Sequence, residues 1–161
     1  MVYDTQDKRN VIGNAMKDNF SKALKFVLKW EGYLSENPDD PGGLTIFGIS
    51  KRHWPKEVEE MSKLELDKAL MVAQRIYKTA YWDALDCDNL PYPEDIVIFD
   101  SGVNCGVSRA KRWCKDSVSW VDIIMDRLNH YNSLKSSTFM AGWVNRLLAL
   151  YKEVKDGNII T

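Results

Sequence analysis

Glu31 is the residue whose place in the sequence best suits acid–base chemistry. Apolar residues before it recur at helical spacing and predict a helix that begins near residue 20: Phe20, Leu24, Val27 and Leu28. At about 100° per residue, Glu31 falls in the middle of this apolar stripe, so its carboxyl group is expected to face inward. Burial disfavours the charged form of a carboxyl group, as a general acid near neutral pH requires. The alternative is a helix-end glutamate that turns into solvent.

The stretch that follows, residues 37–45, combines carboxylates and a hydroxyl group with turn-forming residues. It contains Asp39, Asp40 and Thr45 among prolines and glycines, which exclude a continuing helix. A turn folded back over the helix end would set a second carboxylate and a threonine opposite Glu31. Two facing carboxylates are the minimum apparatus of glycoside hydrolysis. Asx turns or calcium binding are the alternatives, although the D-x-[DN]-x-[DN]-G spacing of a calcium loop is absent.

Together the two stretches resemble a known signature. Residues 28–33 (LKWEGY) and 39–49 (DDPGGLTIFGI) closely resemble the E-G-G-Y and D-x-G-G-x-T-x-x-G-I motifs of glycoside hydrolase family 108. This family comprises lysozyme-like N-acetylmuramidases of phages and bacterial secretion systems. Shorter similar segments extend the resemblance over about residues 20–155, including the family's C-terminal peptidoglycan-binding half: residues 81–82, 90–91, 99–106, 109–110 and 142–147.

The resemblance implies roles for individual residues of the two stretches. Glu31 matches the family's catalytic glutamate, and Asp40 and Thr45 match the carboxylate and hydroxyl positions of its D-x-G-G-x-T turn. Asp39 remains an alternative to Asp40, because phage lysozymes of another family separate the aspartate and threonine by one more residue. Tyr33 replaces the family's second glycine after the glutamate, and we expect it to be the aromatic residue that stacks on a sugar.

Three residues farther along the chain are candidate substrate contacts. Trp82 follows a predicted helix and precedes a polar stretch, so it either stacks on a sugar or packs in the core. Asp100 lies on an inward helical face with Asn104 one turn later, so the pair belongs either to a buried polar network or to the substrate site. The resemblance favours substrate contact by Asn104, because an amide can both donate a hydrogen bond to an N-acetyl group and accept one from it.

The elements that must position these residues are mainly helical. We expect a lysozyme-like helical domain with a short loop or β-hairpin after the first helix. A capping box at Ser62 predicts a second helix that ends near Tyr81, and residues 96–99 fit a helix better than a strand. The length suits one domain. We assign residues 1–19 to an N-terminal extension and residues 20–161 to the domain, with a catalytic half at about 20–90 and a peptidoglycan-binding half at about 91–155.

Composition narrows the class of function. The chain has 22 Lys and Arg against 23 Asp and Glu, so no overall positive charge favours nucleic acid. No apolar run reaches the roughly 20 residues of a membrane span. His53 and His130 lack metal-ligand spacing, and Cys87, Cys105 and Cys114 form no C-x-x-C pair, so we expect no metal and no cofactor. We expect a monomer.

The resemblance implies cleavage of the β-1,4 bond between N-acetylmuramic acid and N-acetylglucosamine in peptidoglycan glycan strands. Glu31 would donate the proton, Asp40 would stabilise the sugar cation or activate water, and Thr45 would position that water. A lytic transglycosylase and a non-catalytic peptidoglycan-binding module are the alternatives. Residues 1–20 lack the apolar centre of a secretory signal. We therefore expect cytoplasmic synthesis and action in the periplasm or cell wall after holin-type or specialised release, as for a phage endolysin or a secretion-associated muramidase.

Overall fold

The computed structural model describes residues 19–36 and 43–157 of the chain. In this part the protein is mainly α-helical, with a small antiparallel sheet directly after the first helix, as the sequence predicted. Asp39 and Asp40 lie outside the described residues. None of the described helices is both long enough and apolar enough to cross a membrane.

The first helix of the described part covers residues 19–31, and we call it the N-terminal helix. Its apolar stripe is buried as the spacing predicted: Ala23, Leu24, Phe26 and Val27 are at most 4% exposed. The helix ends at Glu31 because Gly32 follows with φ 72°, a left-handed conformation that glycine adopts without a steric penalty. The amide of Gly32 donates to the carbonyl oxygen of Leu28 and completes the last turn.

The short element after this helix is a three-stranded antiparallel sheet, so of the two predicted possibilities the hairpin is correct. Its strands are β1 (Leu34–Glu36), β2 (Leu44–Ile46) and β3 (Ile49–Ser50), in that order. Ile46 pairs with Leu34 on one side and Ile49 on the other. Phe47 and Gly48 form the tight turn between β2 and β3, both with positive φ as a two-residue hairpin turn requires.

Helices α2 (Pro55–Met61) and α3 (Leu66–Ile76) follow the sheet, and a π-helix, η1 (Tyr77–Asp83), continues α3. The sequence predicted that the helix now seen as α3 starts with a capping box at Ser62, and this predicted start is wrong, because α3 begins at Leu66. Ser62 instead ends α2, where its hydroxyl group donates to the carbonyl oxygen of Glu59. α2 starts earlier because Pro55 fits the first turn of a helix, where no amide hydrogen is needed.

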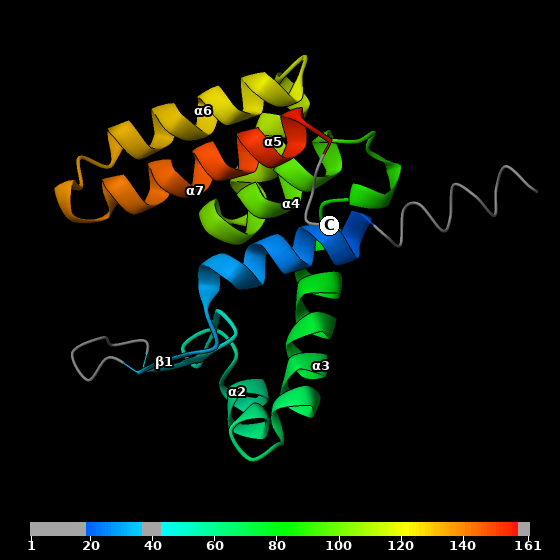
Figure 1. The fold of residues 1–161 in the computed structure, drawn as a ribbon, viewed down its shortest axis with the longest axis vertical. Helices are drawn as coiled ribbons and strands as arrows, with labels where there is room; N and C mark the ends of the chain where they lie inside the picture. The colour runs from blue at the N-terminus through cyan, green and yellow to red at the C-terminus, as the bar shows by residue number, and fades with distance from the viewer. Residues whose placement is uncertain (1–18, 37–42, 158–161) are drawn as a thin grey trace, which may run out of the picture.

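The remaining elements form a helical group. A 3₁₀ turn, η2 (Cys87–Asn89), precedes α4 (Glu94–Cys105), α5 (Val107–Asp116), α6 (Trp120–Ser133) and α7 (Ser137–Lys155). Residues 96–99 are helical, as predicted, and are completely buried within α4. α4 contacts α5 and α6, and α6 packs against α7. Figure 1 shows the N-terminal helix running between these helices and the part formed by the sheet, α2 and α3.

Candidate active site

The carboxyl group of Glu31 lies at the C-terminal end of the N-terminal helix, where this helix meets both parts of the molecule. The side chain is 25% exposed, so it is neither fully buried nor free in solvent. A carboxylate is electrostatically unfavourable at this end of a helix, because the last carbonyl groups already carry partial negative charge. A cation nearby is therefore needed to offset it.

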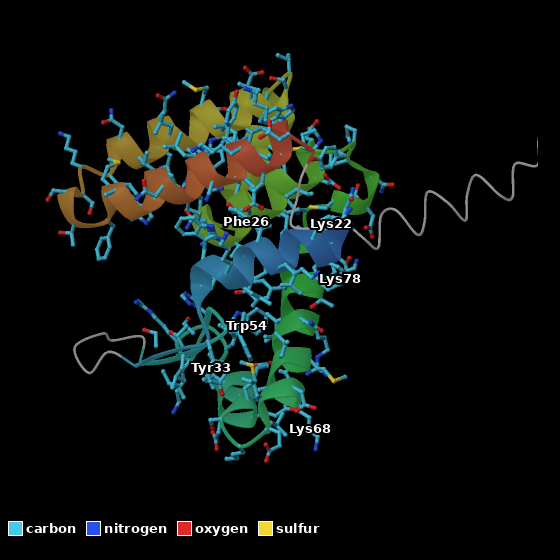
Figure 2. The ribbon with its side chains drawn as sticks, in the orientation of Figure 1. Lys22, Phe26, Tyr33, Trp54, Lys68 and Lys78 are labelled. Carbon is cyan, nitrogen blue, oxygen red and sulfur yellow. The ribbon has the colours of Figure 1, made fainter. Side chains whose placement is uncertain are left out.

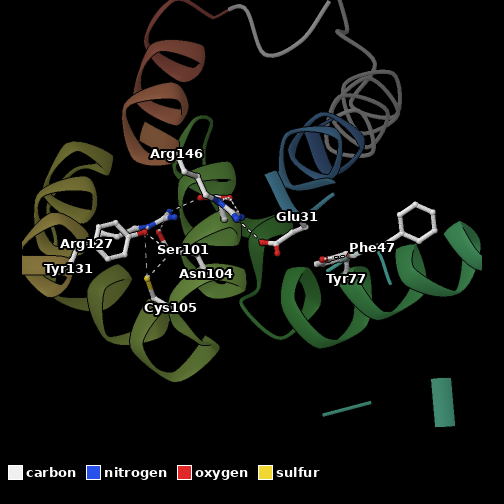
Figure 3. Close-up of polar contacts among 10 residues, drawn as sticks. Glu31, Phe47, Tyr77, Ser101, Asn104, Cys105, Arg127, Tyr131 and Arg146 are labelled. Carbon is white, nitrogen blue, oxygen red and sulfur yellow. Dashed lines mark hydrogen bonds and ion pairs between the residues drawn. The ribbon is translucent and has the colours of Figure 1, made fainter. Parts of the chain in front are cut away.

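Arg146 of α7 supplies this cation. Its Nη1 donates to Oε1 of Glu31 at 2.6 Å, although the two residues are 115 positions apart in the sequence. The other side of the same guanidinium group faces Asp100 of α4, where Nε and Nη2 donate to Oδ1 at 3.1 and 2.7 Å. Among the described residues, Oε2 of Glu31 has no hydrogen bond. Figure 3 shows Arg146 between the two carboxylates.

Asp100 is buried in this network and does not line an accessible surface. Its side chain is 1% exposed, and its second oxygen accepts from Nη1 of Arg127 at 2.6 Å. Burial opposes ionisation, but Arg146 and Arg127 outweigh it and hold the pKa of Asp100 below its ordinary value. Of the two predicted roles for Asp100, the structure supports the buried network and not substrate contact.

The turn between β2 and β3 packs directly against Glu31. A Cβ atom added at Gly48 would lie 2.7 Å from both Cβ and Cγ of Glu31 and 2.5 Å from the hydroxyl group of Tyr77. The turn is held in place because Tyr77 donates to the carbonyl oxygen of Phe47 at 2.8 Å and the Phe47 amide donates to Tyr33 at 2.7 Å. The turn therefore fixes the stem of the Glu31 side chain, while Arg146 fixes one end of its carboxyl group.

Two tyrosines of η1 lie within electrostatic reach of Glu31. Burial raises the pKa of Tyr77 and Tyr81, and the negative charge of Glu31 raises both further. Tyr81 is half-buried, and Figure 2 shows Trp54 between the sheet and α3. A π-helix inserts an extra residue per turn and is frequent at functional sites. Tyr77 and Tyr81 lie four positions apart and so share one face of this element.

Thr45, the predicted water-positioning residue, is the central residue of β2. It pairs with Ser35 of β1 and Ser50 of β3. Because alternate residues of a strand face opposite sides, Thr45 lies on the face opposite to the buried Ile46. It belongs to the hairpin that touches Glu31, but Asp40 and Asp39 lie outside the described residues, so the pairing of Glu31 with a second carboxylate stays a prediction.

The predicted sugar contacts have different surroundings. Tyr33 is 50% exposed, two residues after Glu31, and its ring packs on that of Phe47 at 4.8 Å between centroids. Trp82 is completely buried between Phe20 and Phe99, so the core role that the sequence left open is correct and sugar stacking is not supported. Its neighbour in the chain, Tyr81, lies within electrostatic reach of Glu31.

Asn104 is half-buried at the far end of the same polar network. Its Oδ1 accepts hydrogen bonds from the hydroxyl group of Tyr131 and, at 3.5 Å, from Sγ of Cys105. Among the described residues its Nδ2 has no acceptor. Contact between Asn104 and an N-acetyl group therefore stays a prediction.

Arg146, Tyr77 and Tyr81 were not identified as site residues from the sequence. The signal for Arg146 was its helical position: it lies one turn before Leu150 and two turns before Val154, both buried. A cation on an apolar stripe needs a buried partner, and carboxylates on an inward face were the available partners. Tyr77 and Tyr81 are four positions apart and so share one helical face, but that spacing does not say that the face meets Glu31.

An apolar groove lies elsewhere, between α6 and α7. It has a volume of about 230 Å³ and is lined only by apolar and aromatic residues, including Ile124, Leu128, Leu147 and Tyr151. It offers no polar group to a hydroxylated sugar and no acid or base. No group of three or more potential metal ligands occurs in residues 19–36 and 43–157.

The arrangement around Glu31 can support proton transfer to a ligand. One carboxyl oxygen is held by a fixed cation, the other is available, and an exposed aromatic ring lies two residues away. Comparisons with curated proteins and with solved structures gave no match. The family model for glycosyl hydrolase 108 matches residues 24–106, just over half of the 161-residue chain, and this span includes Glu31, the sheet and α4. The chain belongs to glycosyl hydrolase family 108, whose members are glycoside hydrolases.

Proposed function

We propose that this protein is a peptidoglycan hydrolase that cleaves the β-1,4 bond between N-acetylmuramic acid and N-acetylglucosamine, with Glu31 as the general acid. Family membership supplies the class of enzyme. The observation that carries the assignment is the carboxyl group of Glu31: Arg146 binds Oε1, while Oε2 has no hydrogen bond in the described part of the chain and the side chain is partly exposed. A partly exposed carboxyl oxygen in this position can reach a substrate oxygen.

In the proposed reaction, Oε2 of Glu31 gives its proton to the glycosidic oxygen as the bond from C1 of the muramoyl residue to that oxygen breaks. Asp40 stabilises the positive charge that develops at C1 or takes a proton from the attacking water, and Thr45 positions that water. The water oxygen bonds to C1 and creates one new reducing end for each bond cleaved. Tyr33 is the proposed sugar-stacking residue, and its exposure beside Glu31 supports this.

We further propose that the protein acts on glycan strands of the cell wall as a phage endolysin or secretion-associated muramidase. In this proposal it reaches the periplasm or wall through holin-type or specialised release. The small net charge of −1 supplies no overall positive field to attract nucleic acid.

Product analysis tests the proposed reaction. The protein is incubated with purified peptidoglycan, new reducing ends are counted, and the soluble fragments are weighed by mass spectrometry. Hydrolysis predicts a reducing end for each cleavage and fragments that have each gained one water. Products that are all 1,6-anhydro sugars, lighter by that water, would show a lytic transglycosylase. Binding to peptidoglycan with no fragment released from acid to neutral pH would show a non-catalytic module.

A further inference from the structure

Four charged side chains form a continuous series that leads from the core to the candidate acid. Arg127 of α6 contacts Asp100 of α4 at 2.6 Å, Asp100 contacts Arg146 of α7 at 2.7 Å, and Arg146 contacts Glu31 at 2.6 Å. Positive and negative charges alternate along the series. Exposure rises toward Glu31, from 0% for Arg127 and 1% for Asp100 to 6% for Arg146 and 25% for Glu31. The series therefore opens to solvent only at the carboxyl group proposed to react.

Stability alone is a poor explanation for this series. Removing charges from water costs free energy, and replacing buried ion pairs with apolar residues is often neutral or stabilising. The cost is visible at Arg127, because its Nη2 is buried without a hydrogen-bond partner among the described residues. Burial also opposes the charge of Arg146, although Asp100 and Glu31 together hold its pKa above the ordinary value. A requirement for geometry explains such a series better than a gain in stability.

The orientation of the Arg146 guanidinium group is fixed independently of its contact with Glu31. Asp100 binds the guanidinium group at both Nε and Nη2, so the planar group cannot rotate, and Nη1 points in a fixed direction. Asp100 in turn cannot rotate, because Arg127 binds its other oxygen. Glu31 therefore meets a donor whose position is set by three helices of the C-terminal part. Figure 3 shows this series of contacts.

We propose that Arg146 is a positioning residue of the reaction, which fixes Oε1 of Glu31 and so presents Oε2 to the glycosidic oxygen. The inference rests on the proposed function. As the proton leaves Oε2, negative charge develops on a carboxyl group that already faces a preorganised cation. Arg146 therefore stabilises the transition state more than the ground state. α7, which lies outside the matched residues 24–106, then belongs to the catalytic machinery as well as to any peptidoglycan-binding surface.

Kinetics of Arg146 variants on soluble, peptide-free glycan strands test the inference. Arg146→Gln should lower kcat by about 100-fold, the loss typical of removing one preorganised donor, with KM changed less than about threefold. Arg146→Lys keeps the charge and should recover part of kcat. Arg75→Gln is the matched control, because Arg75 is an exposed arginine of α3, and it should match wild type. Urea unfolding reports whether each variant is folded.

A spectroscopic measurement adds a readout that does not depend on turnover. In protein with ¹³C-labelled glutamate, the Glu31 carboxyl resonance, assigned as the signal lost in Glu31→Gln, should move in Arg146→Gln and stay in place in Arg75→Gln. A folded Arg146→Gln with wild-type kcat, or with only KM raised, would overturn the inference. If Arg146→Gln does not fold, Arg146→Lys decides: a reduced kcat supports the inference and a wild-type kcat overturns it. An inactive wild-type protein would instead overturn the proposed function, and the inference with it.

Discussion

Gly48 is the residue at which the hairpin touches the proposed acid, and a single added methyl group tests that contact. Gly48→Ala places Cβ 2.5 to 2.7 Å from Tyr77 and Glu31 and forces alanine into a φ of 78°. Tyr77 cannot move freely because it is bonded to Phe47. We expect a loss of about 1–3 kcal/mol in the free energy of unfolding, measured in urea, and a larger fractional loss of activity as Glu31 is displaced.

Gly142→Ala is the matched control for this substitution. Gly142 is an exposed residue of α7 with no atom within 4 Å of an added Cβ and no positive φ. Alanine should stabilise the helix there by about 0.5–1 kcal/mol and leave the rate unchanged. A Gly48→Ala protein as stable and active as Gly142→Ala would contradict the packing described around Glu31.

Tyr33 offers a separate test of substrate binding. Its ring is 50% exposed and contacts Phe47, so removing it should disturb the fold little. Tyr33→Ala should raise KM about fivefold, the equivalent of roughly 1 kcal/mol of stacking, with kcat nearly unchanged. Tyr33→Phe keeps the ring and should resemble wild type. Steady-state kinetics on soluble glycan strands provide the measurement, and unchanged binding by Tyr33→Ala would remove Tyr33 from the site.

At this scale the sequence singled out Glu31 as the candidate acid but gave no information on its partners. Helical periodicity placed Glu31 on the inward stripe, because that reasoning needs only local spacing. The contact with Arg146 joins residues 115 positions apart, and local spacing carries no information about which distant cation a carboxylate meets. Trp82 and Tyr81 show a related difficulty: the π-helix alters which of two adjacent aromatic residues faces the core, and a period of 3.6 does not anticipate it.

Among the elements, α6 carries Arg127 and begins with a clear N-cap. The hydroxyl group of Ser119 accepts from the Asp122 amide at 3.3 Å and donates to the Asp122 carboxylate at 2.9 Å. Ser119→Ala should lower the free energy of unfolding by about 1 kcal/mol in urea, with activity per folded molecule retained. Ser108→Ala in α5, where no side-chain cap is present, should change stability by less. Equal effects of both would argue against the cap.

The elements were predicted most reliably where several local signals agreed. The apolar stripe predicted the N-terminal helix, and the glycine-rich stretch predicted the loop or hairpin that follows it. The helix predicted to start at Ser62 begins at Leu66 as α3, and a separate helix that was not predicted, α2, precedes it. Ser62 is used at a helix end instead. A capping motif identifies a boundary between helices without saying which helix it terminates.

In the molecule as a whole, Asp95 links the N-terminal helix to α4. It is 3% exposed and accepts a hydrogen bond from Asn19 at 2.9 Å. Burial raises its pKa from an ordinary 3.8 to about 6, with hydrogen bonds from Asn19 and Ile96 opposing the shift. The folded protein therefore retains this proton between about pH 4 and 6, where the unfolded chain has lost it. The contribution of Asp95 to stability is greatest below pH 4 and falls as the pH rises through 6.

A comparison of wild type with Asp95→Asn isolates this effect. The free energy of unfolding of wild type relative to the variant should decrease between pH 4 and 6 by on the order of 2 kcal/mol and stay level above pH 7. Urea unfolding at a series of pH values measures it. A difference that is constant with pH, or that grows as the pH rises, would contradict the burial described for Asp95.

The organisation of the whole chain also bears on the predicted division near residue 90. The family match runs through that position to residue 106, and the charge series ties Glu31 to α4, α6 and α7. The sequence could suggest two halves from resemblance, but how they share a site depends on contacts between distant helices. Separate catalytic and peptidoglycan-binding roles for residues 20–90 and 91–155 stay a prediction.

The most direct test of the central claim is the rate at which wild type and Glu31→Gln release reducing ends from purified peptidoglycan. Glutamine keeps the shape of the side chain and can still accept from Arg146, but it cannot donate the proton. We expect the variant, folded by circular dichroism, to lose at least about 100-fold in rate, whereas Glu60→Gln on the exposed face of α2 should match wild type. A folded Glu31→Gln protein with near wild-type activity would contradict the assignment and place the acid elsewhere.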